Sequence, residues 1–399
     1  MFFELILAIA IGSILGIITG ITPGVHINLV AAILFTITPF LVQYMHPFVI
    51  AIAIVAMSIV HTFLDILPST FLGAPDESNI MLALPAHKLL LQGKGYEAVK
   101  LATTGSFLGL LMVFVLLPGL LIFIPFIFEA LKNYVGIILL LVALFMILRD
   151  SNRFWSFFVF CISGCLGIAV FSLNIKEPLF PMLSGLFGVS TLLMSLSQKV
   201  QIPEQQITET IHVSKKEMVK SVIAGTLSGT IVSIFPGMGP AQSAVLGGSI
   251  VGEIKEHTYL VLVGAIGTVS MLLSLITLFT IEKARNGSIV VVQKMLETID
   301  FTMFILLLTV SLLAACFGVM LTMSFVKGFA KNITKVNYTI LSISIIAFIV
   351  SLVFFFSGFL GILVLMTSTA IGMLPELVKA GKSHAMGCLL IPVILGFLL

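Results

Sequence analysis

A histidine and an aspartate four residues apart, His61 and Asp65, lie within a long apolar run. Residues at this spacing share one face of a helix, so the imidazole and the carboxylate can interact. Ionisable side chains inside an apolar segment are costly in lipid and usually mark an ion or proton path. The pair is therefore a candidate for binding a coupling ion, and a buried structural ion pair is the alternative.

Two Pro-Gly pairs interrupt the long apolar runs at 1–43 and 221–250. Proline removes a backbone donor and glycine tolerates unusual dihedral angles, so both runs should break there and form hairpins. Inside a membrane such a break is tolerated where protein or a wet cavity surrounds it, and the new helix N-termini attract anions. A packed kink is the alternative. The candidate substrate-binding residues around the breaks are Pro23, Gly24, His26, Asn28, Pro236, Gly237, Gln242 and Ser243.

Two polar loops differ in charge. The loop at 73–79 contains Asp76 and Glu77, whose oxygens suit a coupling cation, with a solvated turn as the alternative. The loop at 282–288 contains Arg285, whose planar guanidinium suits a carboxylate or a phosphate. An acidic loop and a basic loop together favour cotransport of an anion with a cation. Arg285 and Asn286 are therefore added to the candidate substrate-binding residues. The residues expected to bind the coupling ion, Na⁺ or H⁺, are His61, Asp65, Asp76 and Glu77.

The composition defines the environment in which these residues must work. Of the 399 residues, 59% are hydrophobic and 9% are charged, against roughly 25% charged in a soluble domain. A multi-pass protein of the cell membrane is therefore predicted, and soluble enzymes, nucleic-acid binders and disulfide scaffolds are excluded as main interpretations. We find no metalloprotease, aspartyl-protease, serine-nucleophile or ATP-binding motif, so the chain is predicted not to be an enzyme and to need no cofactor or metal site.

The apolar runs and the loop charges give a topology. At roughly 20 residues per crossing, about ten transmembrane helices are expected in addition to the two re-entrant hairpins. Lysine-rich and lysine-poor loops alternate along the chain, and the rich ones are assigned to the cytoplasm. The basic stretch at 282–300 breaks this alternation, and we expect its beginning to dip into the protein. The polar residues expected at solvated loops are Glu129, Asp150, Glu177, His212 and His257.

The chain contains an internal repeat. Gly12, Gly16 and Pro23-Gly24 recur as Gly225, Gly229 and Pro236-Gly237, each 213 residues further on. We therefore predict an all-α polytopic protein with a first membrane repeat at 1–198, a cytoplasmic linker at 199–220 and a second repeat at 221–399. The loop charges place the second repeat upside down relative to the first. Inverted repeats with broken helices are typical of secondary transporters, whose substrate sites form where the repeats meet.

With these motifs in view, the chain resembles the large permease of the tripartite tricarboxylate transporters (TctA type), in the shorter form typical of archaea. The resemblance implies a permease with duplicated halves and Pro-Gly hairpins near the substrate path. In bacterial systems of this type, a binding protein delivers a carboxylate, a small membrane subunit assists and an ion gradient drives transport. The segments that carry it are Gly16-x3-Gly20-x2-Pro23-Gly24, the His61–Asp65 helix with Gly73-Ala74-Pro75-Asp76-Glu77, Gly93-x-Gly95-Tyr96-Glu97-Ala98, Phe235-Pro236-Gly237-Met238-Gly239 and Lys283-Ala284-Arg285-Asn286-Gly287.

The predicted function is gradient-coupled transport of a carboxylate-like organic anion at the paired hairpin tips. The alternative is a translocase for polyprenyl phosphate or another lipid-linked phosphate, since paired Pro-Gly hairpins in inverted repeats also resemble that class. A membrane scaffold or an intramembrane enzyme is a third interpretation. The expected partners are membrane lipid and either a small anion or a lipid phosphate. No nucleic acid is expected to bind. The sequence does not decide between a monomer and a homodimer, or whether accessory subunits are needed.

Overall fold

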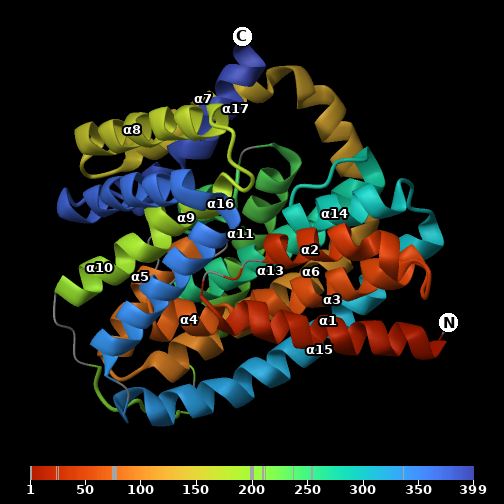
Figure 1. Ribbon diagram of the computed structural model, residues 1–399, viewed down its shortest axis with the longest axis horizontal. Helices are drawn as coiled ribbons and strands as arrows, with labels where there is room; N and C mark the ends of the chain where they lie inside the picture. The colour runs from red at the N-terminus through yellow and green to blue at the C-terminus, as the bar shows by residue number, and fades with distance from the viewer. Residues whose placement is uncertain are drawn as a thin grey trace.

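The computed structural model describes residues 2–23, 25, 27–73, 79–197, 202–208, 211, 213–236, 238–252, 255–335 and 337–399. Throughout these ranges the regular structure is helical, without a strand (Figure 1). Nine segments of the described chain are long and apolar enough to cross a membrane. The protein is therefore an all-α, multi-pass membrane protein, as the composition predicts.

The first half begins with a hairpin of two helices and continues through a series of longer and shorter helices. Its elements are α1 (Phe2–Ile21), α2 (Ile27–Leu41), α3 (Pro47–Leu64), α4 (Ile66–Phe71), α5 (Ile80–Leu91), α6 (Gly95–Leu131), α7 (Val135–Arg149), α8 (Arg153–Ser172), α9 (Leu179–Leu183), a π-helical turn (Ser184–Val189) and α10 (Ser190–Ser197).

The second half repeats this order. Its elements are α11 (Lys215–Ile234), α12 (Pro240–Val251), α13 (Glu256–Ile281), α14 (Gly287–Leu296), α15 (Phe301–Asn332), α16 (Tyr338–Leu377), a 3-10 turn (Lys382–Met386) and α17 (Gly387–Leu398). The hairpin α1–α2 corresponds to α11–α12, α3 with α4 to α13, α5 to α14 and α6 to α15. The boundaries of the two repeats and their opposite orientation in the membrane remain predictions.

The two halves exchange their packing partners. Within each half the first hairpin helix packs on the long central helix, α1 on α3 and α11 on α13. Across the halves α3 packs on α15, and α13 packs on the counterpart of α15, which is α6. The same exchange joins α8 to α17 and the second limb of α16 to the π-helical turn. Such reciprocal contacts are what two copies related by a two-fold axis would make.

The repeated glycines bring the paired helices close together. A Cβ at Gly12 would lie 2.3 Å from the carbonyl oxygen of Ala53, on α3. In the second half a Cβ at Gly225 would lie 2.9 Å from the carbonyl oxygen of Leu262, on α13. Small residues at helix interfaces allow this close approach of backbones in membranes. The glycine match found in the sequence thus reflects the same helix contact made twice.

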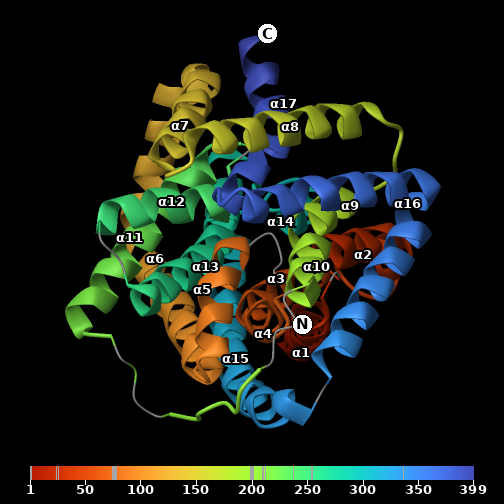
Figure 2. The same ribbon diagram turned by 90° about the vertical axis from the view of Figure 1, so that its left-hand side faces the viewer.

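The helix α16 is too long for a single crossing of the membrane. A continuous helix of its 40 residues would be about 60 Å long, twice the roughly 30 Å hydrocarbon layer. The backbone leaves helical geometry at Gly358, where φ is 64° and ψ is −160°, and Figure 2 shows the sharp bend there. The segments before and after Gly358 are therefore the two limbs of one bent helix.

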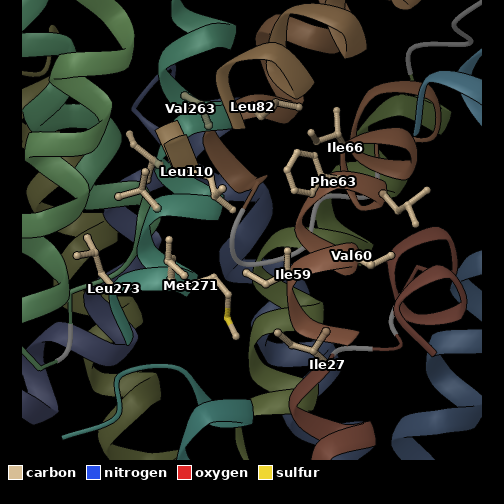
Figure 3. Packing of buried hydrophobic residues seen from close by; sticks show 14 of the residues in the cluster. Ile27, Ile59, Val60, Phe63, Ile66, Leu82, Leu110, Val263, Met271 and Leu273 are labelled. Atoms are coloured by element: carbon tan, nitrogen blue, oxygen red, sulfur yellow. The ribbon is translucent and has the colours of Figure 1, made fainter. Parts of the chain in front are cut away.

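The core lies around α3 and α13. In both of these segments 89% of the membrane-spanning window is buried, whereas in α1 the value is 28% and in α16 it is 22%. Figure 3 shows part of this core, in which Phe63 of α3 and Ile66 of α4 lie across from Leu110 of α6 and Met271 of α13. The two central helices are thus shielded from lipid, and the polar groups that they carry face protein.

The described part of the linker holds the turn between α5 and α6. The Gln205 side chain accepts a hydrogen bond from the Gly95 amide (2.8 Å) and donates one to the Leu90 carbonyl (3.0 Å). The Gln206 amide donates to the Gly93 carbonyl at 2.8 Å. The linker therefore supplies an acceptor for the first turn of α6, whose amides have no partner inside the helix.

Candidate functional site between the broken hairpins

Both apolar runs break at the Pro-Gly pairs. The first hairpin leaves helical structure between Ile21 and Ile27, and the second between Ile234 and Pro240. The carbonyl groups at the ends of α1 and α11 therefore have no helical donors, and the first turns of α2 and α12 present free amides. Of the predicted residues at these tips, Gly24, His26 and Gly237 lie outside the described residues.

The loop after α13 folds back over the helix that it leaves. The helix ends at Ile281, and the residue that follows it, Glu282, has a left-handed φ of 54°. Two successive amides, those of Arg285 and Asn286, donate to the hydroxyl oxygen of Ser274, both at 2.8 Å. Ser274 is fully buried on α13. Ser274 lies seven residues before the end of α13. Its hydroxyl therefore holds the main chain of the basic loop against the side of this helix.

Arg285 reaches the second hairpin. Its Nη2 donates to the carbonyl oxygen of Ile234, the last residue of α11, at 2.5 Å. Its Nε is buried and has no hydrogen-bond partner among the described residues. The guanidinium thus occupies the negative end of a broken helix, where cations are stabilised, and keeps a buried donor available for another acceptor.

The same loop touches the first hairpin on its other side. A Cβ at Gly287 would lie 2.6 Å from the side-chain carbon Cγ of Asn28, in the first turn of α2. The Asn286 side-chain oxygen caps α14 by accepting from the Ser288 amide (3.0 Å) and hydroxyl (2.9 Å). The Ser288 hydroxyl lies 2.8 Å from that of Ser58, on α3. The loop is thus held between α2, α3 and α11.

These contacts bring several predicted substrate residues to one place. Arg285 and Asn286 belong to the loop at 282–288, and Asn28, from a distant part of the sequence, lies against that loop. Their neighbours Ser274 and Ser58 were not singled out in the sequence, because lone serines in apolar helices are common and most bond their own helix.

Gln242 and Ser243 contribute to the second hairpin in different ways. The Gln242 oxygen accepts from the Gly239 amide at 2.8 Å, which satisfies one free donor of the break. Its Nε2 is buried without a hydrogen-bond partner among the described residues. The Ser243 hydroxyl donates to that of Ser228 at 3.1 Å and so ties α12 to α11. Gln242 therefore offers a donor to a ligand, whereas Ser243 holds the hairpin together.

The histidine–aspartate pair lies beside the other hairpin. His61 Nε2 and Asp65 Oδ2 are 3.6 Å apart, and the two side chains are 3% and 2% exposed. His61 Nδ1 lies 3.1 Å from the hydroxyl of Thr19, in the last turn of α1. The pair thus sits next to the break of the first hairpin, where α3 passes into α4. The other two residues predicted for coupling, Asp76 and Glu77, lie outside the described residues.

Two residues expected at solvated loops are largely buried instead. Asp150 is 13% exposed, and its Oδ2 lies 2.9 Å from Nε2 of His384. His257 is 22% exposed and lies 3.8 Å from Glu97, which is 2% exposed. The expectation was wrong because each partner comes from the other half of the chain, which the sequence spacing does not reveal. Glu129 is solvated as expected, at 70% exposure, and His212 lies outside the described residues.

The fold and the site define a class of protein. Broken hairpins that meet a basic loop at the junction of two similar halves are features of a multi-pass membrane transporter. The model of the tripartite tricarboxylate transporter TctA family matches residues 6–387. The chain therefore belongs to this family, whose members are membrane transporters of tricarboxylate-type substrates.

A relative extends this result across the whole chain. An uncharacterized protein of Methanocaldococcus jannaschii is 30% identical over 413 residues, which cover 98% of this chain and 99% of that protein. No solved structure matches the chain.

Proposed function

We propose that the protein moves a carboxylate-bearing organic anion across the membrane, and that the anion binds at the basic loop between the two broken hairpins. The observation that carries the proposal is the position of Arg285, which donates to the end of α11 and keeps a buried Nε without a partner in the described chain. Arginine is the side chain best suited to a planar carboxylate, because its donors form a rigid fork.

Charge supports an anionic ligand. No carboxylate of the described residues forms an ion pair with Arg285. Arg285 is half-buried, and a positive charge that is partly removed from water gains from a counterion, which an anionic substrate would supply. The buried amide nitrogen of Gln242 would add a neutral donor from the second hairpin, and Asn28 would approach from the first.

The coupling cation is assigned to the neighbourhood of His61 and Asp65. An imidazole, a carboxylate and the Thr19 hydroxyl meet within a segment that is otherwise apolar and buried. Such a group can take up a proton, and its oxygens can bind Na⁺. Thr19 belongs to the last turn of α1. Binding of a cation to this group would therefore affect the geometry of the break in the first hairpin. Asp76 and Glu77 remain candidates for the same task.

Uptake into proteoliposomes tests the proposal. Labelled tricarboxylates, dicarboxylates and a lipid-linked phosphate should be offered separately, each with no gradient, a sodium gradient or a pH gradient. We expect carboxylate accumulation that requires one of the two gradients. Movement of the lipid phosphate without carboxylate uptake would instead identify a lipid translocase. Addition of a binding protein or a small membrane subunit would show whether either is required.

A further inference from the structure

A small basic cavity lies at the base of the second hairpin, away from the loop at 282–288. Its volume is about 260 Å³, below the roughly 300–1,000 Å³ of pockets for drug-sized ligands. Three of its six lining residues are lysines and one is an acid, so its charge is positive. The lining residues are Lys216, Glu217, Lys220, Val251, Lys255 and Thr258.

The cavity joins three helix ends. Lys216 and Lys220 come from the start of α11, Val251 is the last residue of α12, and Lys255 and Thr258 flank the start of α13. Lys220 donates to the carbonyl oxygen of Val251 at 2.8 Å, which links the two ends of the hairpin. The start of α13 has no side-chain cap, so its free amides add positive potential to that of the lysines.

The single acid leaves most of this charge uncompensated. Glu217 accepts hydrogen bonds from the Ser214 hydroxyl (2.7 Å) and amide (3.2 Å) as part of a capping box. Its other oxygen lies 4.0 Å from the Lys255 ammonium. Lys216 and Lys220 are exposed on the same face of α11, so an anion in the cavity meets two further cations.

An exposed apolar stripe runs from this cavity along α11. Val219, Ile223, Leu227 and Ile231 are 54%, 41%, 46% and 44% exposed and recur every four residues. The stripe therefore lies on one side of the helix, and its first residue immediately precedes Lys220. A headgroup cavity followed by an apolar stripe is the arrangement that suits a lipid, because a soluble anion would use only the cavity.

We infer that the phosphate headgroup of an anionic membrane lipid binds in this cavity, with an acyl chain along the α11 stripe. The lysine-rich linker before α11 is predicted to be cytoplasmic, which places the cavity in the leaflet where anionic lipids attract basic residues. The bound lipid bridges the ends of α11 and α12 and the start of α13, so it stabilises the base of the second hairpin. This site is independent of the proposed carboxylate site.

Thermal unfolding of the purified full chain in neutral detergent tests the inference. Phosphatidylglycerol should raise the melting temperature by roughly 2–4 °C, whereas phosphatidylcholine, inorganic phosphate and glycerol 1-phosphate should not. The variant K216Q/K220Q/K255Q should lose this rise. The matched control K327Q/K331Q/K335Q removes three lysines near the end of α15, also predicted to be cytoplasmic, and should keep it.

Each outcome decides the inference. If the triple variant does not fold, Lys255→Gln alone serves instead, because Lys255 is 84% exposed and makes a long ion pair of 4.0 Å with Glu217. Loss of the phosphatidylglycerol effect in the cavity variant alone supports the site. An equal rise with glycerol 1-phosphate would show a site for free anions, and no rise in the unaltered chain, or the same rise in the cavity variant, would overturn it.

Discussion

The guanidinium of Arg285 donates a hydrogen bond to the carbonyl oxygen of Ile234, a residue 51 positions earlier in the chain. The contact joins the loop after α13 to the end of α11, the point where the second hairpin breaks. On the opposite side of the same loop, Gly287 lies against Asn28 of the first hairpin. A single short loop therefore contacts both broken hairpins, and a ligand that binds Arg285 would act on the geometry of both.

Replacing Arg285 tests the proposed anion contact. Arg285→Gln should lower carboxylate uptake by roughly 10- to 100-fold, because a charge-assisted hydrogen bond is lost. Lys283→Gln removes a positive charge from the same loop, but Lys283 is exposed and lies over the Phe128 ring. This control should transport normally in the same proteoliposome assay. Equal uptake by the two variants would exclude Arg285 from the anion site.

Ser274 is expected to position the basic loop. Ser274→Ala leaves two partly buried amides without an acceptor, which should destabilise the protein by roughly 1–3 kcal/mol and lower uptake. Ser270→Ala is the matched control one helical turn earlier, where the hydroxyl has no hydrogen-bond partner in the described chain. Denaturant unfolding in detergent should separate the two. Similar stability of both variants would show that the hydroxyl of Ser274 does not hold the loop.

Gly287 is expected to be intolerant of a side chain. A methyl group there would lie 2.6 Å from Asn28, so Gly287→Ala should push the loop away from the first hairpin and reduce uptake. At Gly267, in the interior of α13, a Cβ meets nothing within 4 Å. Gly267→Ala should leave uptake unchanged and add up to about 1 kcal/mol of helix stability. Normal uptake by Gly287→Ala would mean that contact between the loop and α2 is dispensable.

Asp65 is expected to couple transport to its driving gradient. Asp65→Asn should abolish the dependence of uptake on the sodium or pH gradient while substrate exchange across the membrane continues, because exchange requires no net ion movement. Glu129→Gln, at a carboxylate that is 70% exposed, is the control and should remain gradient-dependent. Comparison of gradient-driven uptake with exchange provides the measurement. Retained gradient dependence in Asp65→Asn would remove this residue from the coupling site.

The contact between Asp150 and His384 should make stability depend on pH. Burial alone would raise the pKa of Asp150, but hydrogen bonds from the Asn152 amide, the His384 ring and the Gly381 amide outweigh it and lower the pKa below 3.8. A carboxylate with a lowered pKa stabilises the fold above its ordinary value, and this contribution is lost as the pH falls through the folded pKa.

Melting temperature measured against pH in detergent checks this relation. The difference between the unaltered chain and Asp150→Asn should be largest at neutral pH and should shrink as the pH falls below about 4. A difference that stays constant across this range would show that the charge of Asp150 does not contribute.

Much of the architecture is determined by the sequence alone. Hydropathy and the Pro-Gly pairs at 23–24 and 236–237 were sufficient to predict an all-α membrane protein with two broken hairpins, because proline removes a backbone donor and glycine tolerates unusual dihedral angles. The glycines at 12, 16, 225 and 229 indicated an internal repeat, because close helix contacts demand small residues at fixed spacing. The same residues identified the family. These features are local, so a linear sequence displays them.

Only the tertiary structure decided which polar groups meet. The contacts between Arg285 and Ile234, between Gly287 and Asn28 and between His384 and Asp150 join residues far apart in the chain. No periodicity encodes such pairs, since each depends on how the two halves exchange helices. Burial by the whole fold likewise decides whether an acid such as Asp150 is solvated or paired. The sequence therefore indicates which side chains are capable of chemistry, and the packing of the two halves of the chain determines which of them lie close enough to act together.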